Sequence, residues 1–347
     1  MPIAGGNSLA ILIPVFNDWE SVRLLLPLLD EVLSPTSWSA TICIVDDGSC
    51  IPVPADWTMQ TSTAIESVEI LHLRRNLGHQ RAIAVGLCHV HESFLADAVV
   101  VMDGGGEDRP ADIVKLLNEF DHSSGKYVIF AERTKRMEGV MFQLFYSIYR
   151  WTHLLMTGIS VRVGNFSVIP PIALNRLMVV SELWNHYAAA VFRARIPFRT
   201  VPLPKGKRLT GESKMNFVNL VVHGLSAMSV FSDQMSVRVL IGATAMAIAL
   251  ALAAIFTNSG SVWSALNLIF EVLMISVLLI FTVIGGRNHL GFLPIRDARY
   301  FIMSKTMIFT RASSLERLAG ALEQSGPANL TFGAPLSSTH AFGELKS

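Results

Sequence analysis

Hydrophobic residues in the first half of the chain fall in short uninterrupted runs, each followed by a polar or glycine-rich turn. Three such runs are Leu9–Val15, Thr41–Val45 and Ala98–Met102. Runs of this kind are typical of strands in a parallel sheet that is covered on both faces. Because such sheets bind ligands at the carboxyl ends of their strands, the polar residues after each run are the candidate site.

Segments with helical periodicity lie between these runs. They cover Trp19–Leu33, Gly78–Phe94 and Pro110–Phe120, the last opening with a proline as helices often do. Alternation of strands and helices predicts a doubly wound α/β domain with a mostly parallel sheet.

Two longer apolar segments follow near the C-terminus. Val239–Phe256 is about 18 residues without a charge, and Leu266–Ile284 is about 19 residues with Glu271 as its one charged group. Each is long enough to cross a hydrocarbon core, so we predict two transmembrane helices. Arginines flank the outer ends of the pair and the connector has no charge, which places both termini in the cytoplasm.

Two further stretches mix aromatic and aliphatic residues. Phe217–Phe231 leads into the first span and is expected to lie in the membrane interface, whereas Val140–Thr157 is either an interfacial helix or a core helix. The predicted organisation is a cytoplasmic domain at 1–215 (with the stretch at 140–157), a juxtamembrane interfacial helix at 216–236, two transmembrane helices at 237–286, and a partly disordered cytoplasmic segment at 287–347.

Composition narrows the function. Hydrophobic residues make up 51% and charged residues 16%, which supports a membrane segment. The net charge of +1 excludes a general nucleic-acid binder, which needs a basic surplus for phosphate contacts. The three cysteines lack metal-ligand spacing, so neither a disulfide framework nor a zinc site is expected.

Groups that could carry chemistry follow the predicted strands. Acidic groups at Asp103, Glu107 and Asp108 form a hard-oxygen cluster suited to Mg²⁺ or Mn²⁺, or else a solvated turn that caps the next helix. Carboxylates at Asp46 and Asp47 suit ribose hydroxyls, or else form the turn. A basic stretch between residues 205 and 214 could hold a diphosphate or a lipid phosphate, or simply contact anionic headgroups.

The order of these motifs resembles one known family. The residues that carry the resemblance are Pro14–Asn17, Val45–Ser49, Arg75–Gln80, Met102 and Asp103 through Pro110, and Arg208 with Gly211–Lys214. Together they resemble glycosyltransferase family 2, and within it the polyprenyl-phosphate glycosyltransferases, which include dolichyl-phosphate mannose synthases and bacterial enzymes that glucosylate undecaprenyl phosphate. The resemblance runs from about Ala10 to Phe217 and implies a GT-A-type fold.

The resemblance also implies roles for individual residues. Asp103 would hold the metal and the donor diphosphate, with Arg208 and Lys214 as further catalytic cations. The implied nucleotide-sugar ligands are Pro14, Asn17, Asp18, Asp46, Asp47, Asn76, Gly78 and Arg133. The implied acceptor-phosphate ligands are Arg208, Ser213, Lys214 and Asn165.

Two positions depart from the family pattern. The second acidic residue of the family's Asp-x-Asp motif falls on Gly105, and we hypothesise that Glu107 supplies the missing metal ligand. An acidic residue of the acceptor region falls on Asn165, which excludes a general base at that position. A phosphate acceptor tolerates this change because it is ionised near neutral pH, whereas a hydroxyl acceptor needs a base. Glu182 is the nearby acidic candidate for that role.

The resulting expectation is inverting transfer of one sugar from a UDP- or GDP-linked donor to polyprenyl (undecaprenyl) phosphate at the cytoplasmic face of the plasma membrane, with Mg²⁺ or Mn²⁺ as cofactor. Two alternatives are a related transferase that acts on a glycolipid hydroxyl, and an inactive homologue that serves as a membrane scaffold. Small residues in the first span would allow copies of the chain to associate, or would pack on the neighbouring span.

Overall fold

The computed structural model describes residues 7–57, 61–133, 151, 153–155, 157–158, 163–211, 217–257, 260–289 and 293–311. Within these residues an eight-stranded sheet has the order β7-β5-β6-β4-β1-β2-β3-β8. Neighbouring strands in the β4-β1-β2-β3 portion are parallel, as are β5 and β7, whereas β6 and β8 pair antiparallel with their neighbours. The strands are β1 (Asn7–Val15), β2 (Trp38–Asp46), β3 (Ile65–Leu73), β4 (Ala98–Val101), β5 (Val128–Arg133), β6 (Val163–Ile169), β7 (Phe198–Leu203) and β8 (Ile302–Thr310).

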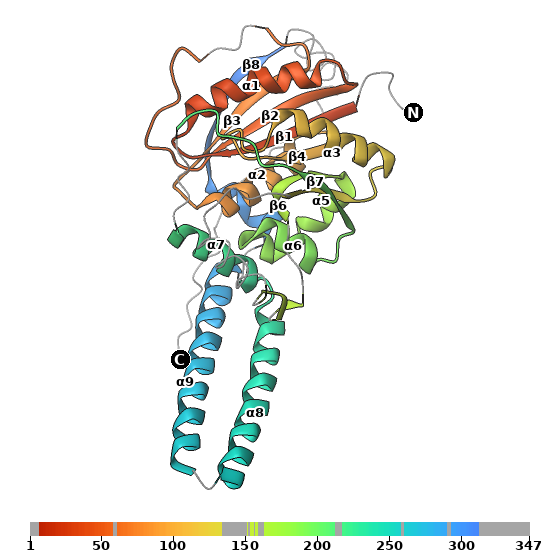
Figure 1. Ribbon diagram of the computed structural model, residues 1–347. Coiled ribbons are helices and arrows are strands. Elements are labelled where there is room, and N and C mark those ends of the chain that lie inside the picture. Colours follow the sequence, from red (N-terminus) through yellow and green to blue (C-terminus); the bar gives the residue numbers. More distant parts are fainter. Residues whose placement is uncertain are drawn as a thin grey trace, which may run out of the picture.

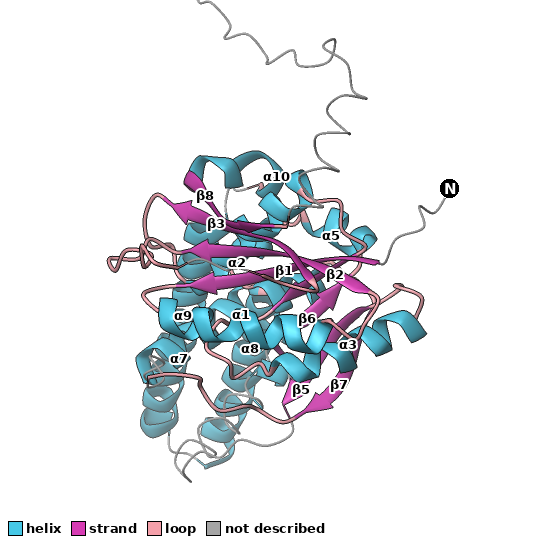
Figure 2. Cartoon of the chain, turned by 90° about the horizontal axis from the view of Figure 1, so that it is seen from above, coloured by secondary structure: helices cyan, strands magenta, loops and turns pink. Residues whose placement is uncertain are grey.

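Helices cover both faces of this sheet (Figure 2). One face carries α1 (Trp19–Leu33) and α3 (Pro110–His122), and the other carries α2 (His79–Ser93), α5 (Pro171–Leu177) and α6 (Tyr187–Arg193). The short elements η1 (Ser181–Trp184), α10 (Pro294–Asp297) and η2 (Ala298–Phe301) complete the domain. The prediction of a doubly wound, mostly parallel α/β sheet is confirmed.

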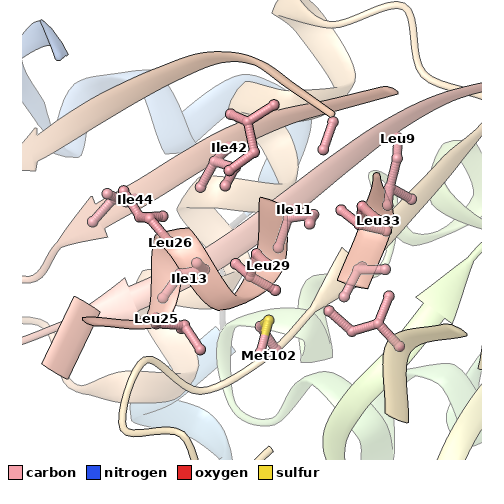
Figure 3. Close-up of a cluster of buried hydrophobic side chains, with 14 of the residues drawn as sticks. Leu9, Ile11, Ile13, Leu25, Leu26, Leu29, Leu33, Ile42, Ile44 and Met102 are labelled. Atoms are coloured by element: carbon pink, nitrogen blue, oxygen red, sulfur yellow. The ribbon is translucent and has the colours of Figure 1, made fainter. Parts of the chain in front are cut away.

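The central strand β1 is buried on both sides, which explains its continuous apolar run. Ile11 and Ile13 point toward α1 and pack with Leu25 and Leu29 (Figure 3). Leu12 points to the opposite face, toward α2. Alternate side chains of one strand thus enter two separate cores, because successive residues of a strand point to opposite faces.

The last strand, β8, was not predicted. It follows the two long apolar helices in sequence, yet it pairs antiparallel with β3 and forms one edge of the sheet. The sheet domain therefore includes a C-terminal strand beyond the predicted boundary at residue 215. The predicted short helix and tail beyond residue 311 lie outside the described residues, as does most of the stretch at 140–157.

Two helices in the described part of the chain are long and apolar enough to cross a membrane (Figure 1). They are α8 (Ser232–Thr257) and α9 (Gly260–His289), which lie against each other and project away from the sheet domain. Almost none of the residues in the apolar part of these helices is buried in the isolated chain, unlike those of a core helix. Helix α7 (Phe217–Ser229) lies between this pair and the sheet domain.

We predict that Asp30 on α1 stabilises the connection to β3. Its carboxylate accepts hydrogen bonds from the Ser62 hydroxyl and from the backbone N–H groups of residues 63–65. Burial raises the pKa of Asp30, but the hydrogen bonds together lower it by more. The pKa of Asp30 therefore lies below its ordinary value. Asp30→Ala should lower the free energy of unfolding by about 1–3 kcal/mol at pH 7. This contribution is present above about pH 4 and is lost as the pH falls through the lower folded-state pKa.

Thermal unfolding of the wild type and the variant between pH 7 and pH 3 checks this. The control is Asp56→Ala, which removes an exposed carboxylate 3.8 Å from Arg23 and should change stability little. A stability difference between wild type and Asp30→Ala that stays constant down to pH 3 would contradict the prediction.

Candidate active site

The ends of three neighbouring parallel strands bring the candidate residues together. Strands β2 and β4 flank β1 on its two sides, so the segments after all three strands emerge at one edge of the sheet. Asn17 and Asp18 follow β1, Asp46 and Asp47 lie at the end of β2, and Asp103 follows β4. The predicted clustering of polar groups at this edge is therefore what the sheet topology produces.

Asn17 fixes the loop after β2 against the end of β1. Its backbone N–H donates to the Ser49 hydroxyl at 2.8 Å, and its side-chain oxygen accepts from the Ile51 N–H at 2.9 Å. The backbone of Asn17 is left-handed, with φ 53°, a conformation that asparagine tolerates better than most residues. Asn17 thus shapes the wall of the site.

The two adjacent aspartates of β2 and its loop face different partners. Asp46 accepts from the Ser49 N–H at 2.9 Å and lies 2.9 Å from His72 Nδ1. Asp47 instead accepts from the Leu77 and Gly78 N–H groups at 2.7 and 2.9 Å. Burial raises the pKa of Asp47, and these two N–H groups oppose that shift. Asp47 anchors the loop that leads into α2, whereas Asp46 contacts His72 on β3.

Arg208 crosses the site from the basic stretch. One guanidinium nitrogen lies 2.5 Å from Asp18 Oδ2, and Nε donates to the Thr210 carbonyl at 3.2 Å. A Cβ on Gly105 would lie only 2.6 Å from Arg208 Nη1. The guanidinium therefore occupies the space next to Gly105 that an aspartate side chain would enter.

Glu107 is held by the same basic stretch. Its carboxylate lies 2.9 Å from Lys205 Nζ, and its backbone carbonyl accepts from the Gly206 N–H at 2.8 Å. Gly106 makes the turn before it with φ 84°, where a side chain would also collide with Leu209. A cation at Glu107 would have to compete with Lys205.

Asp103 pairs with a residue that the sequence analysis did not select. Its Oδ1 lies 3.2 Å from Nε2 of His79, the first residue of α2. Burial lowers the pKa of His79, but the negative charges of Asp103, Asp108 and Asp47 raise it above its ordinary value. Asp108 in turn accepts from the Asp103 N–H at 2.8 Å.

A series of amide hydrogen bonds runs from this pair to the start of α6. Asn165 Nδ2 lies 3.0 Å from His79 Nε2, and Asn165 Oδ1 accepts from Gln80 at 3.0 Å. Gln80 Oε1 accepts from the Tyr187 N–H at 2.8 Å. Asn165, predicted to bind acceptor phosphate, therefore contacts the partner of Asp103.

The residue before Tyr187 contacts helix α7. His186 Nε2 lies 3.2 Å from Nε2 of His223 on α7. Burial and the neighbouring His223 hold the pKa of His186 well below its ordinary value. Nearby, the Asn185 amide donates to the Ser229 hydroxyl at 3.1 Å. Residues 185–187 thus link the strand-end site to α7.

The remaining predicted site residues lie next to the groups described above, on other elements, or outside the described residues. Ser213, Lys214 and the side chain of Arg133 lie outside the described residues. Pro14 is buried within β1, Asn76 is exposed on the loop before α2, and Gly78 directly precedes His79. Glu182, the candidate base for a hydroxyl acceptor, lies 3.4 Å from Arg193 on α6.

Sequence reasoning missed His79, Gln80 and His72 as site residues. His79 and Gln80 lie inside the motif Arg75–Gln80 that supported the family resemblance, so the signal was present. Which histidine faces Asp103, however, depends on how α2 packs on the sheet. Asp103 and His79 offer one oxygen and one nitrogen ligand atom 3.2 Å apart, a pair that fits a divalent cation.

Comparison with known proteins identifies the domain. Residues 10–174 match the family described as Glycosyl transferase family 2, so the chain contains a glycosyltransferase domain of this family.

Similar proteins carry related names. The chain is 25% identical over 232 residues to the uncharacterized glycosyltransferase YkcC of Bacillus subtilis (strain 168), covering 65% of this chain and 68% of that protein. It is 23% identical over 230 residues to an undecaprenyl-phosphate 4-deoxy-4-formamido-L-arabinose transferase of Klebsiella pneumoniae, covering 62% and 64%. A solved glucosyl-3-phosphoglycerate synthase from Mycobacterium tuberculosis, in complex with Mn²⁺, UDP-glucose and phosphoglyceric acid, is 11% identical with a TM-score of 0.45, covering 66% and 80%.

We predict that Gly105→Asp, which recreates the family spacing, weakens donor binding. The new carboxylate would face Arg208 and form an ion pair with it, so the guanidinium would be drawn from Asp18 and from a donor diphosphate. Loss of one charge-assisted contact should weaken UDP or GDP binding by about tenfold. Isothermal titration with each nucleotide measures the change.

Gly105→Asn is the matched control, because it adds the same volume without the charge. It should weaken binding less than Gly105→Asp does. Equal or tighter nucleotide binding by Gly105→Asp would show that Arg208 does not compete for the added carboxylate.

Proposed function

We propose that this glycosyltransferase transfers a single sugar, with inversion, from a UDP- or GDP-linked donor to a polyprenyl phosphate such as undecaprenyl phosphate. The reaction would take place at the cytoplasmic face of the plasma membrane, with both chain termini on that side. The donor would lie at the strand ends, near Asn17, Asp18, Asp46 and Asp103.

One observation carries the choice of a membrane acceptor. A short series of contacts joins the donor edge to the juxtamembrane helix: Asp103 to His79, His79 to Asn165, Asn165 to Gln80, Gln80 to Tyr187, and the adjacent His186 to His223 on α7. A lipid phosphate at the membrane surface would therefore lie close to the reacting sugar. A soluble acceptor would need no such link.

The chemistry of the site also favours a phosphate nucleophile. A phosphate monoester has a second pKa of about 6 and is already ionised near neutral pH, so no base has to remove a proton. The acceptor region offers Asn165, whose amide can donate to a phosphate oxygen, in place of a carboxylate. The acceptor oxygen would bond to the anomeric carbon as the bond from that carbon to the diphosphate breaks. This single displacement inverts the anomeric centre and releases the nucleoside diphosphate.

Positive charge would stabilise the departing diphosphate. Arg208 is held over Gly105 at the strand ends, and Lys214 and Ser213 are expected in the same basic stretch. A divalent cation bound at Asp103 would supply further charge neutralisation in this site. Catalysis would rest on positioning and electrostatic stabilisation rather than on proton transfer.

A hydroxyl acceptor is the second candidate, and the position of Glu182 weighs against it. Glu182 lies beside Arg193, which also lies 2.8 Å from Asp233 on α8. This carboxylate is engaged in joining α6 to the first membrane helix. It is therefore a poor candidate for a base that must accept a proton from a sugar hydroxyl.

A transfer assay tests the proposal. Purified full-length protein in detergent is mixed with undecaprenyl phosphate, Mg²⁺ or Mn²⁺ and a panel of UDP- and GDP-sugars, and lipid-linked sugar is detected by mass spectrometry. We expect one sugar-phosphate-lipid product, reduced by at least about a hundredfold in Asp103→Asn. Chelation of the metal should also abolish the product.

The control is Asp56→Ala, on the exposed surface away from the strand ends, which should retain activity. Nucleotide-sugar binding without a product from any donor would contradict the proposal and favour an inactive scaffold. An Asp103→Asn variant with unchanged turnover would contradict the assigned role of Asp103.

A further inference from the structure

The divalent cation of this site lacks the second carboxylate that its family position would supply. Gly105 has no side chain, and the Arg208 guanidinium lies where one would extend. Glu107, the hypothesised substitute, is paired with Lys205. A second protein ligand for the ion must therefore come from another element.

His79 is placed for this role. Its Nε2 lies 3.2 Å from Asp103 Oδ1; the two side chains are 41% and 39% exposed, while Oδ1 itself is buried. Two adjacent ligand atoms of an octahedral ion with bonds of about 2.1 Å are separated by about 3 Å. The two atoms already have nearly that separation without any movement of the backbone.

Hydrogen bonding favours the form of His79 that binds a metal. The Tyr187 N–H fixes the oxygen of Gln80, so the Gln80 amide nitrogen faces Asn165 Oδ1. Asn165 must then present its N–H side to His79 Nε2, at 3.0 Å. An N–H donor opposite Nε2 favours a lone pair on that nitrogen, which is the form that ligates metals. A bound ion would take this lone pair in place of the Asn165 N–H.

The surrounding charge favours a cation at the same point. Asp103 Oδ1 lies 3.2 Å from His79 Nε2, and the Asp108 carboxylate is held beside Asp103 by the Asp103 N–H. Two carboxylates close to Nε2 attract a divalent ion to this point. The released Asn165 N–H would then be available to a phosphate oxygen.

We propose that His79 and Asp103 together ligate the divalent cation, and that His79 makes the site prefer Mn²⁺ to Mg²⁺. This inference rests on the proposed function, since the ion would serve departure of the donor diphosphate. Imidazole is a good ligand for transition-metal ions, whereas Mg²⁺ is bound through oxygen.

The test is pulsed electron paramagnetic resonance of Mn²⁺ bound to the purified full chain with UDP or GDP. Electron spin-echo envelope modulation detects ¹⁴N nuclei bonded to Mn²⁺. We expect imidazole ¹⁴N modulation in the wild type, replaced by ¹⁵N signals in protein grown with ¹⁵N-histidine. The modulation should vanish in His79→Gln and in His79→Ala, and it should persist in His91→Gln, which changes a histidine farther along α2. A ¹⁴N modulation that persists in both His79 variants would overturn the proposal. This holds even if the signal came from the buried His89, which lies near Cys43 and Glu69.

Metal affinity gives a second readout. His79→Ala should weaken Mn²⁺ binding by at least about tenfold and reduce the preference for Mn²⁺ over Mg²⁺. Glu107→Gln should leave both the ¹⁴N modulation and the Mn²⁺ affinity largely unchanged. A large loss of Mn²⁺ affinity in Glu107→Gln with none in His79→Ala would assign the ligand to Glu107 and overturn the proposal.

The two proposals fail in different ways. Bound Mn²⁺ without ¹⁴N modulation in a wild type that transfers sugar to undecaprenyl phosphate would overturn the role of His79 alone. Clear ¹⁴N modulation in a protein that transfers no sugar to that lipid would overturn the proposed function and leave the assignment of His79 intact.

Discussion

The crowding of carboxylates at the carboxyl edge of the parallel sheet is the constraint on which the rest of the site depends. Strands β1, β2 and β4 lie side by side, so Asp18, Asp46 and Asp103 are brought to one edge. Each carboxylate needs its own compensation: Asp18 has Arg208, Asp46 has His72 and a backbone N–H, and Asp103 has His79. These partners come from elements far apart in sequence. The partners that balance the charge of the strand ends therefore come from the basic stretch, helix α2 and strand β3.

This arrangement joins two kinds of surface in one chain. The strand ends suit a charged, water-soluble donor, whereas α8 and α9 are apolar and exposed. Between them, His186 meets His223 on α7, and Arg193 pairs with Asp233 on α8. These polar contacts hold α7 and α8 against the sheet domain. The strand β8, which follows the apolar helices, pairs with β3, so the chain enters and leaves the pair of apolar helices next to one sheet.

The parts that could be predicted from the sequence are those fixed by local pattern. Strand β1 is buried on both faces and reads as a continuous apolar run, and helix α1 was predicted with its observed bounds, Trp19–Leu33. Strands β3, β5, β6, β7 and β8 were not predicted. Among them, β3 mixes charged and apolar residues, and β8 is an exposed edge strand that pairs with a segment more than two hundred residues earlier. The acidic strand ends were likewise predictable, but His79 was not, since its distance from Asp103 is set by how α2 packs. The direction of Glu107 depends on the turn at Gly106 and on Lys205.

The central claim is that an already ionised lipid phosphate is the acceptor, reached through the contact between the catalytic domain and α7. The most direct measurement compares undecaprenyl phosphate with undecaprenol, the same lipid ending in a hydroxyl, at equal concentration and with the same donor. The account predicts sugar transfer to the phosphate alone, because Asn165 stands in place of the acidic residue of the acceptor region and Glu182 is paired with Arg193. Comparable transfer to undecaprenol would contradict it.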